Sequence, residues 1–235
     1  MSSSDELFYE LRLYSIAPGR LADMANRFRN DLNTLFPKHG VLPLAGWTAT
    51  AGMGMPRFVY MMPWHSLEQR ARSLSAFAGD PQWAEVRNRT NGPSELVERY
   101  DIHLLKAITP LQPIAQGSSD ATAVYELAIQ QVANGRAADV RQMLAEVELP
   151  AYVSAGAVVI GAFDMLFGPQ LPSVVTLLKW PDEAARAAGL VALNADRSLH
   201  QSRQEQIADS GRCLLGHADR YLLNVVDVQW AALAQ

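Results

Sequence analysis

The sequence predicts an α+β protein made of two tandem ferredoxin-like units, each in the order βαββαβ, which together form an α/β barrel. Three observations carry this prediction. The second half of the chain repeats the first at an offset of 116 residues, and each half shows the same succession of strands and helices. A segment rich in proline, glycine and serine separates the halves. The predicted domains are 6–108 and 122–228, and 109–121 is the linker.

The repeat indicates which residues belong to the fold. Tyr-Glu-Leu at 9–11 recurs at 125–127, and the offset holds without a gap further along the chain. It pairs glycines, tryptophans and arginines: Gly19 with Gly135, Trp64 with Trp180, and Arg70 with Arg186. We interpret these shared residues as structural, with the glycines in a turn, the tryptophans in the core and the arginines in ion pairs on a helix surface.

Local patterns place the elements of each unit. In the first half, alternation and apolar runs predict strands over 7–14, 41–50, 57–62 and 100–108. Leu21 begins an apolar helical stripe that Pro37 is expected to end. Two more helices are expected after Ser66, which forms a capping box with Gln69, and after the Asp80-Pro81 pair. The second half repeats the pattern, with strands over 157–166, 173–178 and 221–228.

A unit of this kind carries its helices on one side of the sheet, so the other side must be covered. The second unit or a second chain can cover it, and either arrangement encloses a barrel. On the first strand, Glu10, Arg12 and Tyr14 share one face, opposite Leu11 and Leu13. We expect the face with Glu10, Arg12 and Tyr14 to line the barrel interior.

Composition narrows the class of protein. The 235 residues are 49% hydrophobic and 19% charged, with a net charge of −4, so the chain can bury a core. Lys and Arg are not clustered, which argues against nucleic acid or an anionic membrane surface as the partner. Cys213 is the single cysteine, and neither a secretory signal nor a membrane span is evident. We expect a cytoplasmic protein without disulfides.

Five motifs of the first half resemble the NIPSNAP family. They are Tyr-Glu-Leu-Arg-x-Tyr at 9–14, Pro-Gly-Arg at 18–20, Lys-His-Gly at 38–40, Trp-x-Ser-Leu-Glu-Gln-Arg at 64–70 and Asp-Pro-x-Trp at 80–83. The second half is a degenerate version in which Ala128 replaces Arg12. The resemblance implies the dimeric α/β-barrel superfamily, which includes cofactor-free monooxygenases, isomerases, lyases and haem-handling proteins. It also implies a homodimer, but it brings no catalytic residues with it.

Residues present in one half alone are the candidates for chemistry. The predicted catalytic residues are Arg12, Tyr14, His39 and His65. Arg12 would steady an anionic or carbonyl-bearing ligand and His39 would move a proton, whereas the structural alternatives are a Glu10–Arg12 ion pair and solvated surface histidines. The predicted substrate-binding residues are Glu10, Trp47, Tyr60, Met62 and Trp64, for which ordinary sheet core is the alternative.

Other sites are not indicated. The histidines, among them His103, show no metal-ligand spacing, so we expect neither a metal nor a tightly bound cofactor. Cys213 lies near Arg212 and His217, but a lone cysteine in a helix is usually inert packing. The favoured function is binding of a small hydrophobic or aromatic molecule inside the barrel, with cofactor-independent catalysis in addition. The alternatives are a non-catalytic scaffold and a haem-handling protein.

Overall fold

The computed structural model describes residues 7–114 and 121–231. The first half comprises β1 (Phe8–Ile16), α1 (Leu21–Asn30), α2 (Leu32–Lys38), β2 (Ala45–Ala51), β3 (Arg57–Trp64), α3 (Leu67–Ala78), α4 (Pro81–Asn91) and β4 (Val97–Ala107). The second comprises β5 (Val124–Val132), α5 (Ala137–Met143), the π-helical turn η2 (Leu144–Glu148), α6 (Leu149–Ser154), β6 (Val158–Phe167), β7 (Ser173–Trp180), α7 (Glu183–Ala195), α8 (Arg197–Ser210) and β8 (Leu215–Val225).

The eight strands form one closed barrel in the order β1-β3-β2-β8-β5-β7-β6-β4. Within each half the strands follow the ferredoxin-like arrangement, and the halves join where β2 pairs with β8 and β4 pairs with β6, both antiparallel. The predicted fold class is therefore confirmed, and the barrel closes within one chain. The homodimer stays a prediction, because the structure contains a single chain.

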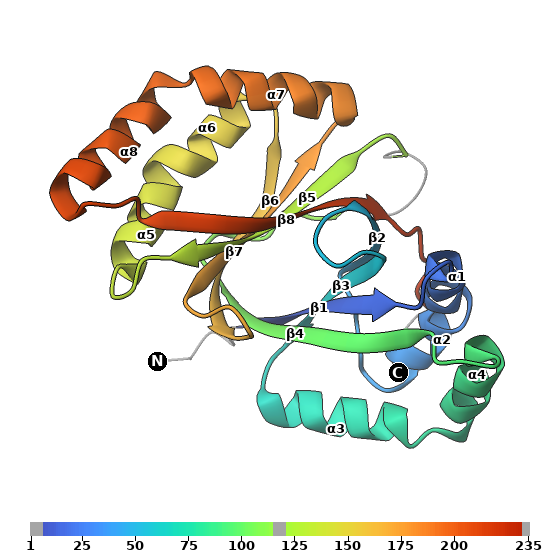
Figure 1. Cartoon of the computed structure of the whole chain (residues 1–235). Helices are drawn as coiled ribbons and strands as arrows, with labels where there is room; N and C mark the ends of the chain where they lie inside the picture. Colours follow the sequence, from blue (N-terminus) through green and yellow to red (C-terminus); the bar gives the residue numbers. More distant parts are fainter. Residues whose placement is uncertain (1–6, 115–120, 232–235) are drawn as a thin grey trace.

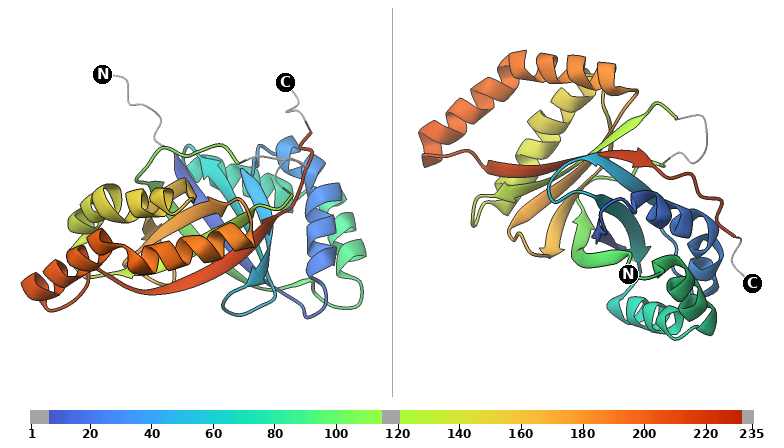
Figure 2. Two further views of the ribbon diagram at one scale, coloured as in Figure 1. Left: turned by 90° about the horizontal axis from the view of Figure 1, so that it is seen from above. Right: turned by 45° about the vertical axis from the view of Figure 1, so that its right-hand side comes forward.

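The helices lie on two opposite sides of this barrel. Helices α1 to α4 cover the strands of the first half, and α5 to α8 cover those of the second half (Figure 1). The view from above separates the two groups, with the barrel between them (Figure 2). Each unit thus covers the open face of the other's sheet.

Side-chain caps fix where several helices begin. Ser66 Oγ accepts a hydrogen bond from the backbone N–H of Gln69 at 3.0 Å, and Asp80 Oδ1 accepts one from Gln82 at 2.9 Å. Both caps confirm the predicted helix starts. Pro37 differs from its prediction, since it lies within the last turn of α2 and the predicted single helix divides at Asp31.

The barrel interior is packed with apolar side chains from all eight strands. They include Leu11 and Leu13 of β1 and Trp47 of β2, which form one buried cluster with residues of β5 to β8. Strand alternation therefore turns Glu10, Arg12 and Tyr14 outwards, under the helices of the first half. The prediction that this polar face lines the interior is wrong. Leu11 and Leu13 fill the barrel, and α3 supplies a charged partner to the other face.

Part of the predicted linker can be located. Residues 108–112 run beside β6, with Ile108 and Gln112 donating backbone hydrogen bonds to Ala162 and Ile160. Residues 115–120 of the linker lie outside the described residues. No helix in the described part of the chain is long and apolar enough to cross a membrane.

Candidate functional site

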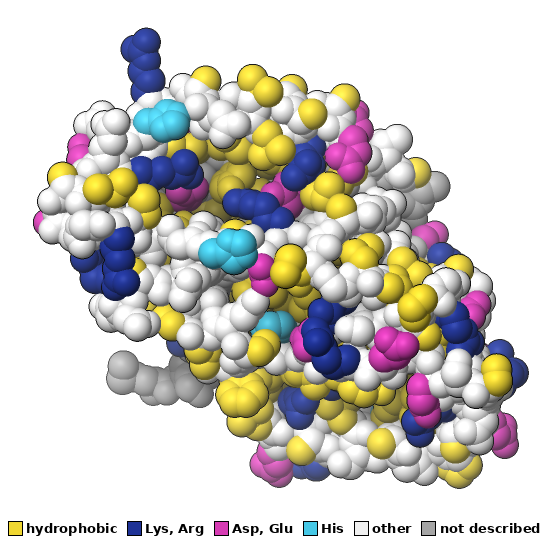
Figure 3. Space-filling model, viewed as in Figure 1, with side chains coloured by type: hydrophobic (Ala, Val, Ile, Leu, Met, Phe, Trp, Pro, Cys, Tyr) yellow, Lys and Arg dark blue, Asp and Glu magenta, His cyan; other side chains and the backbone are white. Residues whose placement is uncertain are grey.

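A pocket of about 250 Å³ lies between the first-half sheet and its helices. Strands β1, β3 and β4 form its floor, and helices α1 to α4 form its walls. Most of its lining is apolar or aromatic, including Met24, Phe36, Met62, Phe77 and Trp83. Figure 3 shows hydrophobic side chains at the surface between β4 and α3, where the pocket opens. The size is just below the range of about 300–1,000 Å³ typical of drug-sized ligands, so it suits a small molecule.

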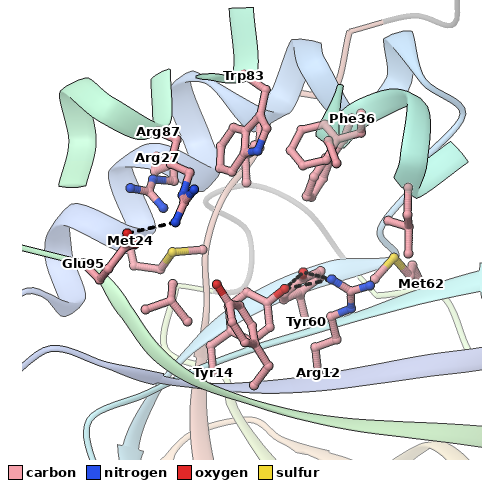
Figure 4. A pocket seen from close by; sticks show the side chains of 16 residues that line it. Arg12, Tyr14, Met24, Arg27, Phe36, Tyr60, Met62, Trp83, Arg87 and Glu95 are labelled. Carbon is pink, nitrogen blue, oxygen red and sulfur yellow. Dashed lines mark hydrogen bonds and ion pairs between the residues drawn. The ribbon is translucent and has the colours of Figure 1, made fainter. Parts of the chain in front are cut away.

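Two tyrosines and an arginine meet at the floor of the pocket (Figure 4). Arg12 Nη1 donates to Tyr14 OH at 2.8 Å and to Tyr60 OH at 3.1 Å. The two hydroxyl oxygens are 2.5 Å apart, so one phenol donates to the other. That bond uses one of the two phenolic protons. The second proton has no acceptor among the described residues, so it can be donated to an oxygen in the pocket.

Arg12 forms an ion pair with Glu10, which is fully buried beneath the floor of the pocket. Glu10 accepts hydrogen bonds from Arg12 Nε at 2.8 Å, from Arg70 Nε at 2.6 Å and from Trp64 Nε1 at 2.9 Å. Burial would raise the pKa of the Glu10 carboxyl, but Arg70 and Arg12 outweigh it and lower the pKa below 4.5. The carboxylate is therefore ionised and fixed in place by donors from three residues.

The same electrostatics decide the protonation of the other groups at the floor. Burial would lower the pKa of the Arg12 guanidinium, but Tyr60, Tyr14 and Glu10 raise it, so Arg12 stays charged. Burial raises the pKa of Tyr60 well above 10, and the neighbouring Arg12 offsets this only in part. At neutral pH the pocket therefore presents the neutral phenol of Tyr60 beside the cation of Arg12.

The second half keeps the carboxylate but supplies its second cation from another strand. Glu126 pairs with Arg186 at 2.8 Å, as Glu10 does with Arg70. The position of Arg12 is Ala128, and Ala128 lies opposite Arg220 of β8, whose Nη1 reaches Glu126 at 2.8 Å. The arginines that we expected on the helix surface are thus partners of a buried carboxylate in both halves.

The wall opposite the tyrosines carries charged groups. Arg27 of α1 is buried, donates to Thr90 Oγ1 at 2.7 Å and to Asn91 Oδ1 at 2.6 Å, and lies 5.6 Å from the ring of Trp83. Arg87 pairs with Glu95 at 2.8 Å at the rim. Burial and the charge of Arg20 lower the pKa of Arg27 to about 10, which still leaves it protonated at neutral pH.

The structure brings together some of the predicted residues and separates others. Arg12, Tyr14, Tyr60 and Met62 line the pocket, and Glu10 and Trp64 support it from behind. Trp47 lies on the opposite face of the sheet, inside the barrel, where it cannot join them.

The two histidines predicted to be catalytic do not line this pocket. His39 Nε2 forms a hydrogen bond with Asp80 Oδ2 at 2.7 Å, and its ring lies near that of Phe77, outside the pocket. His65 is exposed before α3. His103 is buried at the end of the barrel, and burial lowers its pKa. Among the described residues, no three His, Cys, Asp or Glu side chains gather as metal ligands would.

The pocket also contains residues that sequence reasoning missed, chiefly Arg27, Trp83 and Tyr100. One signal could have found the correct face of the sheet. Glu10, Trp64 and Arg70 recur together at the repeat offset as Glu126, Trp180 and Arg186. In both halves the glutamate is on the first strand and the arginine is on the helix that follows the third strand. This repeated charged pair indicates that the polar face of the first strand points towards the helices.

The fold and the pocket define an α/β-barrel protein with ferredoxin-like halves and a small-molecule-sized cavity under the helices of one half. The NIPSNAP family model matches residues 9–110, and the predicted resemblance is therefore confirmed for the first half of the chain.

Solved structures share the fold over the whole chain. A candidate monooxygenase of Lactobacillus acidophilus is 12% identical, with a TM-score of 0.57, and the match covers 98% of this chain and 100% of that one. An anthrone oxidase-like protein is 13% identical, with a TM-score of 0.53 and 99% of each chain covered. A variant of chlorite dismutase from Candidatus Nitrospira defluvii is 10% identical, with a TM-score of 0.52, covering 96% and 94%. No protein of curated function matches the sequence.

Proposed function

We propose that the protein binds a small, largely aromatic molecule bearing a hydroxyl or carbonyl oxygen in the pocket between the first-half sheet and its helices. The observation that carries this proposal is the buried Tyr14–Tyr60–Arg12 cluster at the floor of an apolar cavity. The aromatic walls supply the binding area, and the spare phenolic proton supplies one directed polar contact.

The cluster also suits a cofactor-independent reaction. A ligand that enters the pocket already ionised, as a phenolate or enolate, would accept a hydrogen bond from the spare phenolic proton beside a fixed cation. The donors are already in place, because Glu10 holds Arg12 and Arg12 holds both hydroxyls. The names of the fold's neighbours, a candidate monooxygenase and an anthrone oxidase-like protein, make oxygen uptake the first reaction to test.

Binding is tested with 2-naphthol and naphthalene, which differ by one hydroxyl, in fluorescence titrations. The native protein should prefer 2-naphthol by roughly tenfold, the worth of one hydrogen bond in a buried site. The double variant Tyr14→Phe/Tyr60→Phe should bind the two compounds about equally. Tyr221→Phe, a matched change of a buried tyrosine that does not line this pocket, should keep the preference.

Two results would count against the proposal. Absence of binding of both compounds to the native protein would show that the pocket does not take aromatic molecules. A preference that survives in the double variant would show that the tyrosines do not contact the hydroxyl. Oxygen consumption with bound 2-naphthol then distinguishes a binding protein from an oxygenase.

A further inference from the structure

The pocket carries more positive than negative charge. At its floor, Arg12 and Arg70 share the single carboxylate of Glu10. At its rim, Arg87 and Glu95 neutralise each other. Arg27 adds a further cation on the wall. This local excess of two positive charges contrasts with the net charge of −4 of the whole chain.

Arg27 has no carboxylate partner within ion-pair distance in the described part of the chain, although only 4% of its surface is exposed. Its donors meet the neutral oxygens of Thr90 and Asn91. The carboxylates that favour its charge from further away, Asp31 and Glu95, are paired with Arg89 and Arg87. Arg20, also close, repels it.

A buried cation without a counter-ion costs stability, since the protein does not repay the loss of hydration. An anion brought by a ligand would restore the balance. A guanidinium is suited to this role, because its planar set of donors can bind both oxygens of a carboxylate. Trp83 stacks on Arg27 and adds an aromatic surface beside it.

We propose that the ligand of this pocket is a small aromatic carboxylate, with its carboxylate paired to Arg27 and its ring between the aromatic walls. The inference rests on the proposed function and adds the charge of the ligand to it. In Figure 4, Arg27 approaches from the helices above, whereas Tyr14 and Tyr60 lie on the strands below. A hydroxylated aromatic acid would therefore satisfy both polar ends of the pocket.

The test uses two acids, 4-hydroxybenzoate and 6-hydroxy-2-naphthoate. The binding of each acid is compared with that of its neutral methyl ester by calorimetric titration of the full chain at neutral pH. The native protein should bind each acid at least tenfold more tightly than its ester. Arg27→Gln should remove this preference while leaving ester affinity within about twofold. Arg72→Gln, an exposed arginine of α3 outside the pocket, should behave like the native protein.

A second variant separates ligand recognition from a structural role. Arg27→Met removes the unpaired charge but keeps an unbranched apolar stem, so the ligand-free protein should melt at the same or a higher temperature. A marked fall in melting temperature would show that Arg27 serves the fold, and would overturn the inference.

The remaining outcomes are distinct. Esters that bind as tightly as the acids, or an acid preference that persists in Arg27→Gln, would overturn the inference and leave the proposed function in place. Failure of acids, esters and 2-naphthol alike would overturn both.

Discussion

Replacing Glu10 with glutamine tests how the floor of the pocket is held. The change keeps the size of the side chain but removes the carboxylate that Arg12 and Arg70 share, and these two side chains are 12% and 26% exposed. Breaking a buried ion pair by removing one partner costs about 3–5 kcal/mol. Because Arg70 is partly solvated, we expect the lower end, about 3 kcal/mol. For a domain of this size that corresponds to a fall in Tm of roughly 6–12 °C.

The assay is thermal unfolding followed by circular dichroism, with Glu68→Gln as the control. Glu68 forms an ion pair with Arg72 on the surface of α3, where both side chains are more than 70% exposed. Such exposed pairs contribute little, so the control should melt close to the native protein. A Glu10→Gln variant that also melts within about 2 °C of the native protein would refute the reasoning.

The destabilisation caused by Glu10→Gln should depend on pH. The pKa of Glu10 is lower in the folded protein than in the unfolded chain, so its ionisation adds stability above the unfolded value. That contribution is lost as the pH falls through the folded pKa. The difference in stability between the native protein and Glu10→Gln should therefore be full at pH 7 and shrink below about pH 4. A difference that grows on acidification would contradict this sign.

Two further predictions concern the barrel itself. Trp47→Ala should lower the free energy of unfolding by about 3–5 kcal/mol, because it opens a cavity in the barrel interior. It should leave 2-naphthol binding unchanged, because Trp47 lies on the face of the sheet opposite the pocket. Loss of binding in titrations would place the ligand inside the barrel. Gly46→Ala should cost about 1–3 kcal/mol in urea denaturation, because its Cβ would lie 2.5 Å from the buried ring of Phe28; an unchanged midpoint would show that α1 can move away from β2.

The fold could be predicted because several independent sequence patterns indicated the same arrangement of strands and helices. Strand alternation, the caps at Ser66 and Asp80 and the repeat all indicated the same βαββαβ unit. The face of the sheet could not be read from alternation, because β1 is buried on both sides and apolar residues occur on both. Alternation separates two faces without saying which one is inside.

The candidate site was predicted in part for a related reason. Strand alternation placed Arg12 and Tyr14 on one face, and Tyr60 was predicted separately as a cavity residue; in the structure Arg12 lies directly opposite Tyr60 on the paired strand. Arg27 and Trp83 reach the pocket from helices α1 and α4 and not from the sheet. Their approach depends on how those helices pack on the sheet, which no local pattern encodes.

The different origins of the second arginine limit how the two halves can be exchanged. In one half the guanidinium stands on the first strand of the unit, and in the other it stands on the last strand, yet each serves an equivalent glutamate. A chimera with alanine at position 12 and no arginine in place of Ile102, the residue opposite on β4, would leave Glu10 with one cation instead of two. The inverse exchange would place three cations around Glu126. The two strands of each pair must therefore be transplanted as a unit.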